Sequence, residues 1–113
     1  MAKIKALVKD PGKAPVIQKV ENTLEALQEL IGGNIECIQT GTLPGVLVLV
    51  DEEGKLKGLP QNFPLYERDV LVDQVVGRAV FVGTDREDFG DIPVIAAELI
   101  VKFMPIIKPE HWA

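Results

Sequence analysis

Side chains that could catalyse a reaction or hold a metal are few in this sequence, and they are far apart. The 113-residue chain has one histidine, His111, one cysteine, Cys37, and no serine. No cysteine or histidine pair has the spacing of a structural zinc site. A threonine or Cys37 acting as a nucleophile would need a neighbouring base, which a single distant histidine does not readily supply. The sequence therefore predicts no metal site, no cofactor and no enzyme activity.

Acidic residues gather in two short segments, 51–53 and 85–91. Paired carboxylates can act as a general acid and base when burial raises the pKa of one of them. Both segments instead have the composition of polar turns, and neither has the regular ligand spacing of a calcium-binding loop. We interpret both as solvated turns.

A better candidate for recognition is the segment 58–66, which combines two prolines, an amide and two aromatic side chains. Loops in compact domains often carry function, and the prolines would make this one rigid. A purely structural role is the alternative, with the amide capping a turn and the aromatic rings packed on a sheet. The candidate binding residues are Leu59, Pro60, Asn62, Phe63 and Tyr66.

A second candidate is the segment 92–104, which reads as a helix that is apolar nearly all round. Asp91, Glu98 and Lys102 fall on one narrow stripe of this helix, and a helix with so little polar surface should be buried on most sides. Either the helix lies in a groove of the sheet with residues 105–112 folded over it, or it forms an interface with a second copy or another protein. The candidate interface residues are Ile95, Leu99, Phe103 and Trp112.

The elements that would position these residues suggest one α+β domain spanning residues 1–113. Apolar residues make up 47% of the chain and charged residues 26%, as in globular proteins. Segments 4–8 and 16–20 read as a hairpin around the turn signal 10–13. A helix follows, beginning at Asn22 with Glu25 three residues later and ending at Gly32 and Gly33.

The rest of the chain reads mainly as strands. Segment 34–40 predicts a strand, and the apolar run 46–50 predicts one that is central to a sheet with both faces covered. Segment 55–58 would be a hairpin return, 59–73 a loop, 75–82 a strand that contains Gly77, and 85–90 a polar loop. We expect a mixed, mostly antiparallel sheet of five or six strands, with the two helices packed on one face.

Charge and cysteine content bear on partners and location. The net charge is −5, and the only local concentration of basic residues is Lys3, Lys5, Lys9 and Lys13, which we interpret as a solvated edge hairpin. Nucleic-acid binding is therefore not expected. Cys37 lies in an apolar run and is expected to be a small buried side chain. With no pair of cysteines for a disulfide and no apolar segment of signal-peptide or membrane-spanning length, we expect a cytoplasmic protein.

Several of these segments together resemble one protein family. They are 9–13, followed by a strand; 21–28, with Gly32, Gly33, Ile35 and Glu36; 51–60, with Asn62; and a strand that contains Gly77 and ends at Val82 and Gly83. In order and spacing they resemble small bacterial and phage proteins catalogued as domain of unknown function 3846, over roughly residues 4–84. Relatives often carry an arginine after the asparagine, where this chain has Phe63. The resemblance implies a setting in bacteria or mobile elements, and no activity, cofactor or catalytic residue.

Two functional hypotheses follow. In the first, the chain is a non-enzymatic binding or adaptor protein that acts through protein–protein contacts, with self-association included. In the second, it binds a small molecule or nucleotide in a pocket near residues 59–66.

Overall fold

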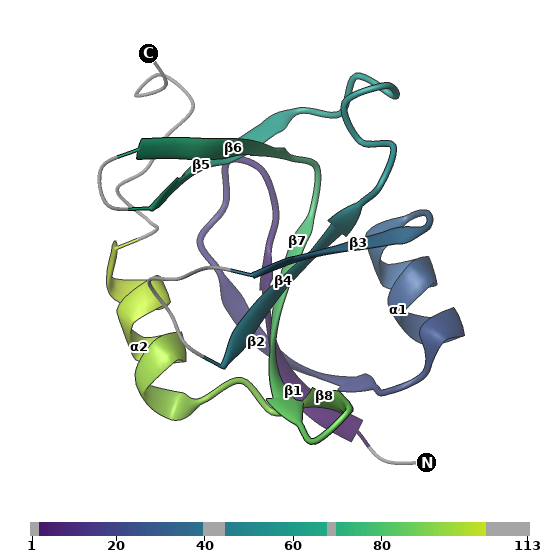
Figure 1. The fold of residues 1–113 in the computed structure, drawn as a ribbon, viewed down its shortest axis with the longest axis vertical. Helices are drawn as coiled ribbons and strands as arrows, with labels where there is room; N and C mark the ends of the chain where they lie inside the picture. Colours follow the sequence, from purple (N-terminus) through teal and green to yellow (C-terminus); the bar gives the residue numbers. More distant parts are fainter. Residues whose placement is uncertain (1–2, 40–44, 68–69, 104–113) are drawn as a thin grey trace.

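The computed structural model describes residues 3–39, 45–67 and 70–103 (Figure 1). His111 and Trp112 therefore lie outside the described residues. The elements, in chain order, are β1 (Lys3–Lys9), β2 (Val16–Glu21), α1 (Leu24–Ile31), β3 (Ile35–Gln39), β4 (Val46–Asp51), β5 (Gln61–Glu67), β6 (Val70–Val76), β7 (Ala79–Asp85), β8 (Asp88–Gly90) and α2 (Val94–Phe103).

Two sheets form the framework of the protein. The main sheet has six strands: five lie in the order β2-β1-β7-β4-β3, and the short strand β8 pairs with β7. Strands β5 and β6 form a separate two-stranded sheet, and every described strand pair is antiparallel. The α+β class and the antiparallel sheet agree with the sequence-based prediction.

The main sheet is covered on both faces, and the two helices lie on opposite sides of it (Figure 1). On one face, Leu27 and Ile31 of α1 pack on one row of apolar side chains. On the other face, α2 and the β5–β6 sheet enclose a second cluster, which includes Phe63 and Phe81. The expectation that both helices share one face is therefore wrong, because strand side chains alternate and both rows of this sheet are apolar.

The apolar run 46–50 explains why the sheet needs two covers. As predicted, β4 lies inside the sheet, between β7 and β3. Val48 and Val50 of β4 face the α2 side, whereas Leu49 faces α1. A strand whose successive residues are all apolar is stable only when each face is packed.

The first helix begins one residue later than the sequence suggested. Thr23, and not Asn22, is the N-cap, and its Oγ1 accepts a hydrogen bond from the Ala26 N–H at 3.1 Å. Asn22 instead donates from Nδ2 to the carbonyl of Phe89. Gly32 ends the helix as predicted, with a left-handed φ of 95° that glycine adopts without strain.

The segment 52–90 departs most from the sequence-based prediction. Residues 61–67 and 70–76 form two paired strands where a loop was expected, and residues 52–58 form successive turns in place of a hairpin return. Gly77 does not lie inside a strand. It has a positive φ of 72° and lies in the turn between β6 and β7. Residues 88–90 form the short strand β8, which pairs with the last residues of β7. The polar loop predicted at 85–90 is therefore shorter than expected.

Candidate functional site

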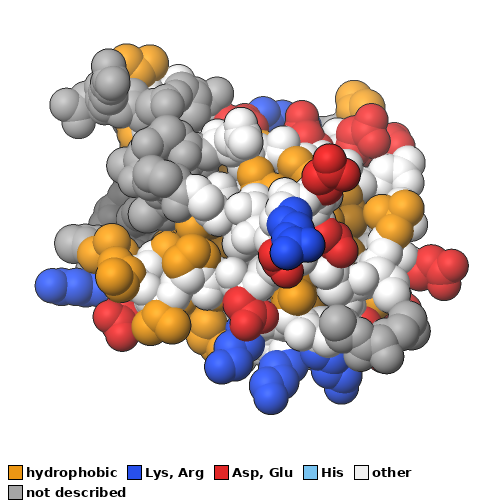
Figure 2. Space-filling view, turned by 60° about the horizontal axis from the view of Figure 1, so that its bottom comes forward, with side chains coloured by type: hydrophobic (Ala, Val, Ile, Leu, Met, Phe, Trp, Pro, Cys, Tyr) orange, Lys and Arg blue, Asp and Glu red, His pale blue; other side chains and the backbone are white. Residues whose placement is uncertain are grey.

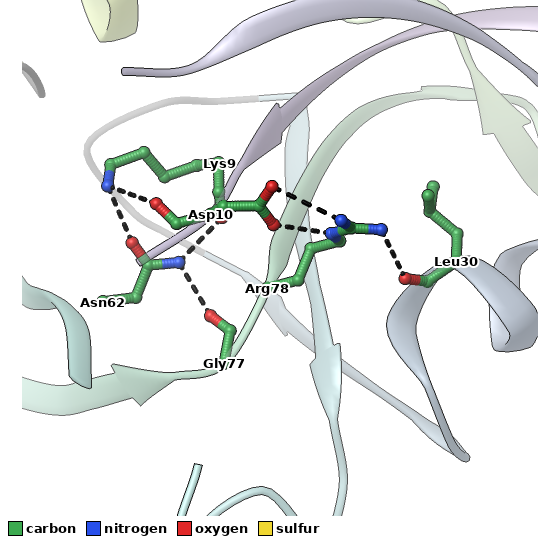
Figure 3. Close-up of polar contacts among 6 residues, drawn as sticks. All are labelled: Lys9, Asp10, Leu30, Asn62, Gly77 and Arg78. Atoms are coloured by element: carbon green, nitrogen blue, oxygen red, sulfur yellow. Dashed lines mark hydrogen bonds and ion pairs between the residues drawn. The ribbon is translucent and has the colours of Figure 1, made fainter. Parts of the chain in front are cut away.

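Asn62, the amide predicted to lie in a recognition loop, is fully buried at the centre of a polar network (Figure 3). Its Oδ1 accepts a hydrogen bond from Lys9 Nζ at 2.9 Å. Its Nδ2 donates to the carbonyls of Lys9 at 2.8 Å and Gly77 at 2.7 Å. Both amide hydrogens of Asn62 are thus hydrogen-bonded. Through these bonds, Asn62 connects the start of β5 to the end of β1 and to the turn between β6 and β7.

A second arm of this network reaches α1 (Figure 3). The Arg78 guanidinium forms a bidentate ion pair with the Asp10 carboxylate, with Nε 2.6 Å from Oδ1 and Nη2 3.3 Å from Oδ2. Nη1 of the same arginine donates to the carbonyl of Leu30 at 3.1 Å. The Arg78 bond holds the pKa of the Asp10 carboxyl below its ordinary value. We refer to Lys9, Asp10, Asn62, Gly77, Arg78 and Leu30 as the polar junction.

Lys9 is the most unusual charge in the junction. The residue is 2% exposed, and its ammonium is bonded to two neutral oxygens, Asn62 Oδ1 and the Asp10 carbonyl. Burial lowers its pKa, and the nearby Asp10 carboxylate offsets only part of this effect. A buried lysine of lowered pKa can be a nucleophile in an open site. Here, however, the hydrogen bonds of Lys9 to Asn62 Oδ1 and to the Asp10 carbonyl hold neighbouring segments together, which is a structural role.

The other residues predicted to bind at 59–66 are dispersed. Phe63 is fully buried and its ring stacks on Phe81, with centroids 5.7 Å apart. Leu59 is partly buried, and Pro60 and Tyr66 are exposed. Asn62 and Phe63 are both buried in the structure. For these two side chains, the observed contacts are those of the structural alternative given in the sequence analysis. Ligand binding by this segment stays a prediction.

Helix α2 leaves apolar side chains on the surface. Ala96, Ala97 and Ile100 pack on the main sheet, as one face of the helix should. The exposed fractions are 71% for Val94, 74% for Ile95, 41% for Leu99 and 42% for Val101. Figure 2 shows hydrophobic side chains gathered over α2, on the left of the view. Ile95 and Leu99 are thus exposed, and their role in an interface stays a prediction. Nothing is described of the side chain of Phe103.

One flank of α2 borders a groove of about 460 Å³ that is almost entirely apolar. The groove lies between α2 and the β1–β2 pair, and Ile17 of β2 is 48% exposed within it. Lysine and glutamate side chains contribute to its lining. The lining residues are Lys5, Ile17, Ile92, Val94, Ala97, Glu98, Val101 and Lys102. A volume of this size is in the range of small-molecule and side-chain binding sites.

The acidic turns do not form a metal site within the described residues, where no group of three or more potential ligands comes together. Asp51 is buried and accepts bonds from Lys57 Nζ at 2.7 Å and the Glu53 N–H at 2.8 Å, and the lysine lowers the pKa of its carboxyl. A cleft of about 90 Å³ borders this turn. It has room for a few water molecules but is well below the size of a typical ligand pocket.

One sequence-based expectation on a single residue is wrong, and two residues of the site were not foreseen. Cys37 is exposed, because it lies on β3, an edge strand that pairs only with β4 among the described strands. Ile17 and Arg78 were missed altogether. The Asp-Pro-Gly turn could have indicated that Asp10 lies at a strand end, but nothing local places it beside Arg78, 68 residues later.

The fold and these features define an α+β domain with a partly buried polar junction on one side and an open apolar groove on another. The chain belongs to the family described as domain of unknown function DUF3846, whose family model matches residues 4–104. The resemblance noted in the sequence is therefore confirmed, and it extends through α2. No curated protein and no solved structure matches the chain. Within the described residues, no helix has the length and apolarity needed to cross a membrane.

Proposed function

We propose that this chain is a non-enzymatic binding or adaptor protein of a bacterial or mobile-element genome, and that it acts through protein–protein contacts at α2. The proposal is based on the apolar groove beside α2 and on four exposed apolar side chains of this helix: Val94, Ile95, Leu99 and Val101. Apolar surface that is contiguous and rimmed by charges is typical of sites that another protein covers. A cytoplasmic location is part of the proposal and rests on the cysteine content of the sequence.

The same groove favours a protein segment over a nucleotide. Its lining offers apolar carbon from Ile17, Ile92 and Ala97, and its charged groups lie in Lys5, Glu98 and Lys102. A nucleotide site needs several polar groups directed at the base and phosphates. The alternative, a small-molecule pocket near residues 59–66, has weaker support, because both amide hydrogens of Asn62 are already bonded within the chain.

Peptide display with counter-selection tests the proposal. Random peptides would be selected on the wild-type chain and counter-selected on Val94→Asp. Val94 is 71% exposed and opens α2, so an acidic residue there suits the helix N-terminus and the fold should persist. Val70→Asp is the matched control, since Val70 is 61% exposed on β6 and does not line the groove.

We expect enriched peptides that bind the wild type and Val70→Asp but not Val94→Asp. Sedimentation of the same three proteins asks whether a second copy occupies the groove: a dimer lost only in Val94→Asp would identify self-association as the contact. The proposal fails if neither a peptide nor a second copy distinguishes Val94→Asp from the other two proteins.

A further inference from the structure

We infer that the groove receives an extended segment of a different polypeptide, which pairs with the edge strand β2, inserts an apolar side chain beside α2 and sets a carboxylate next to Lys5 and Lys19. This inference rests on the proposed function and specifies its binding mode and the chemistry of its partner. The inference is based on three features that lie side by side: the outer edge of β2, the apolar groove beside α2, and the lysine pair Lys5 and Lys19.

The strand edge comes first. Among the described strands, β2 pairs only with β1, and none of its six residues belongs to the buried class. In an antiparallel pair, alternate backbone N–H and C=O groups of the outer strand point away from its partner. An added strand can bond to those groups, which gives affinity, while pockets for alternate side chains give specificity.

The register of β1 and β2 determines which side chains face the groove. Ile17 lies opposite Leu7, whose side chain belongs to the core on the α2 side, and Lys19 lies opposite Lys5. Because strand side chains alternate, Ile17, Lys19 and their partners share that face. A strand added about 4.8 Å from β2 would bring one inward side chain beside Ile17 and the next beside Lys19.

Charge then selects the partner. Lys5 and Lys19 stand directly opposite each other, an arrangement that repulsion disfavours. Neither ammonium takes part in an ion pair among the described residues. The acidic groups around this pair include Glu21, which shares the same face two residues from Lys19, Asp91, whose Oδ1 accepts the Lys5 backbone N–H at 2.8 Å, and Glu98 in the groove lining. Figure 2 shows basic side chains along the lower margin, below the apolar patch. A partner carboxylate would relieve the repulsion.

The partner should therefore present an apolar residue and an acidic residue two positions apart, since residues at that spacing share a face of a strand. A second copy of this chain fits poorly. Pairing two β2 strands about a two-fold axis at Ile17 places Pro15, which lacks an N–H, opposite Lys19. Centring the pair on Lys19 places two ammonium groups opposite each other. Centring the pair on Gln18 places the apolar Ile17 opposite the Lys19 ammonium, so neither side chain meets a complementary one. Pairing Lys19 with Glu21 leaves Ile17 beyond the short paired segment.

A designed peptide tests the inference. The probe is acetyl-Thr-Glu-Thr-Leu-Thr-Glu-Thr-amide with a fluorescent label, which presents a carboxylate two residues from the leucine whichever way the strand runs. The matched peptide replaces both glutamates with lysine. Binding is measured by anisotropy, and protection of the β2 backbone amides by hydrogen exchange in NMR spectra.

We expect the glutamate peptide to bind the wild type at least about tenfold more tightly than the lysine peptide, because one lysine side chain of the latter would lie beside Lys5 and Lys19. The double variant Lys5→Glu and Lys19→Glu should reverse that preference. Ile17→Asp should weaken binding about tenfold, as half-burial of an isoleucine predicts, whereas Val70→Asp should leave it unchanged. Bound peptide should protect alternate amides of β2.

Several results would overturn the inference. Equal binding of the two peptides would refute the acidic partner, and binding that shifts α2 amides without protecting those of β2 would refute strand addition while leaving the proposed function standing. Absence of binding up to about 1 mM peptide, roughly 4 kcal/mol of affinity, would refute the inference as a whole. The counter-selected display experiment would then decide the proposed function separately. A dimer abolished by Ile17→Asp would replace the foreign segment with a second copy.

Discussion

Replacing Asn62 with alanine should cost a large part of the stability of this protein. The side chain is fully buried, and its amide makes three hydrogen bonds. One of them serves the Lys9 ammonium, and a bond to a charged group contributes about 1.5–3 kcal/mol. The other two serve backbone carbonyls of Lys9 and Gly77, at about 1 kcal/mol each. Removing the amide also leaves these groups buried without a partner.

The expected loss is therefore about 4 kcal/mol, against a total stability of about 5–15 kcal/mol for a domain of this kind. Urea unfolding of Asn62→Ala and the wild type, followed by circular dichroism, measures it. Asn34→Ala is the matched control, because the Oδ1 of this exposed residue accepts one bond from Gln28 at 3.3 Å. The control should lose about 0.5 kcal/mol or less.

A double-mutant cycle with Lys9→Met isolates the contact between Asn62 and the ammonium. Its coupling energy should be about 1.5–3 kcal/mol. A loss below about 1 kcal/mol in Asn62→Ala, or a coupling near zero, would refute the reasoning, because water or a shifted side chain would then satisfy the same groups.

Three further outcomes are expected. Phe63→Ala should lose about 3–5 kcal/mol in urea unfolding, because it removes a buried ring stacked on Phe81; a loss comparable to that of the exposed Val70→Ala would contradict the packing. Asp51 has a pKa held below its ordinary value of 3.8 by Lys57, so its contribution is present above that value and disappears as the pH falls through the folded-state pKa. Thermal unfolding below about pH 4 should therefore fall more steeply for the wild type than for Asp51→Asn, and parallel curves would argue against the ion pair. Cys37 should react with a thiol reagent in the native protein, because it is exposed; burial of part of the thiol and the nearby Glu36 raise its pKa and should slow the reaction, and a requirement for denaturant would place it in the core.

The parts of the fold that depend on local pattern were predictable. The run 46–50 identified an internal strand because five consecutive apolar residues bounded by turn residues are stable only between two packed layers. Gly12 and Gly32 marked a turn and a helix end because each has positive φ in the structure, 74° and 95° respectively. These features need no knowledge of distant residues.

The parts that depend on tertiary contacts were not predictable. Asn22 and Thr23 are both good N-cap residues, and the choice between them follows from the bond of Asn22 to Phe89, 67 residues away. Pro60 and Pro64 obscured β5, because proline disfavours an internal strand. The β5–β6 pair tolerates Pro64 because it has only two strands, and it has register shifts at Gln61/Phe63 and Leu65/Tyr66.

For the candidate site, the sequence identified the apolar character of α2 but not the groove beside it. The apolar content of the segment 92–104 was visible, and Ile95 and Leu99 are indeed on the surface. The neighbouring wall, Ile17, comes from a strand about 80 residues earlier, and only the fold brings the two together. Asn62 was singled out as a binding residue, whereas the bonds that the structure gives it are to Lys9 and Gly77 and lie beneath the surface.

The polar junction also ties together the two sides of the main sheet. The Gly77 carbonyl accepts a hydrogen bond from Asn62 of β5, on one side of the sheet. The next residue, Arg78, donates to the Leu30 carbonyl in the last turn of α1, on the opposite side. Either apolar layer can therefore separate from the sheet at this end only by breaking a bond to the adjacent residues Gly77 and Arg78. In hydrogen-exchange experiments, the amides of α1 and of the β5–β6 pair should open together as one cooperative unit, although their described side chains belong to different apolar clusters.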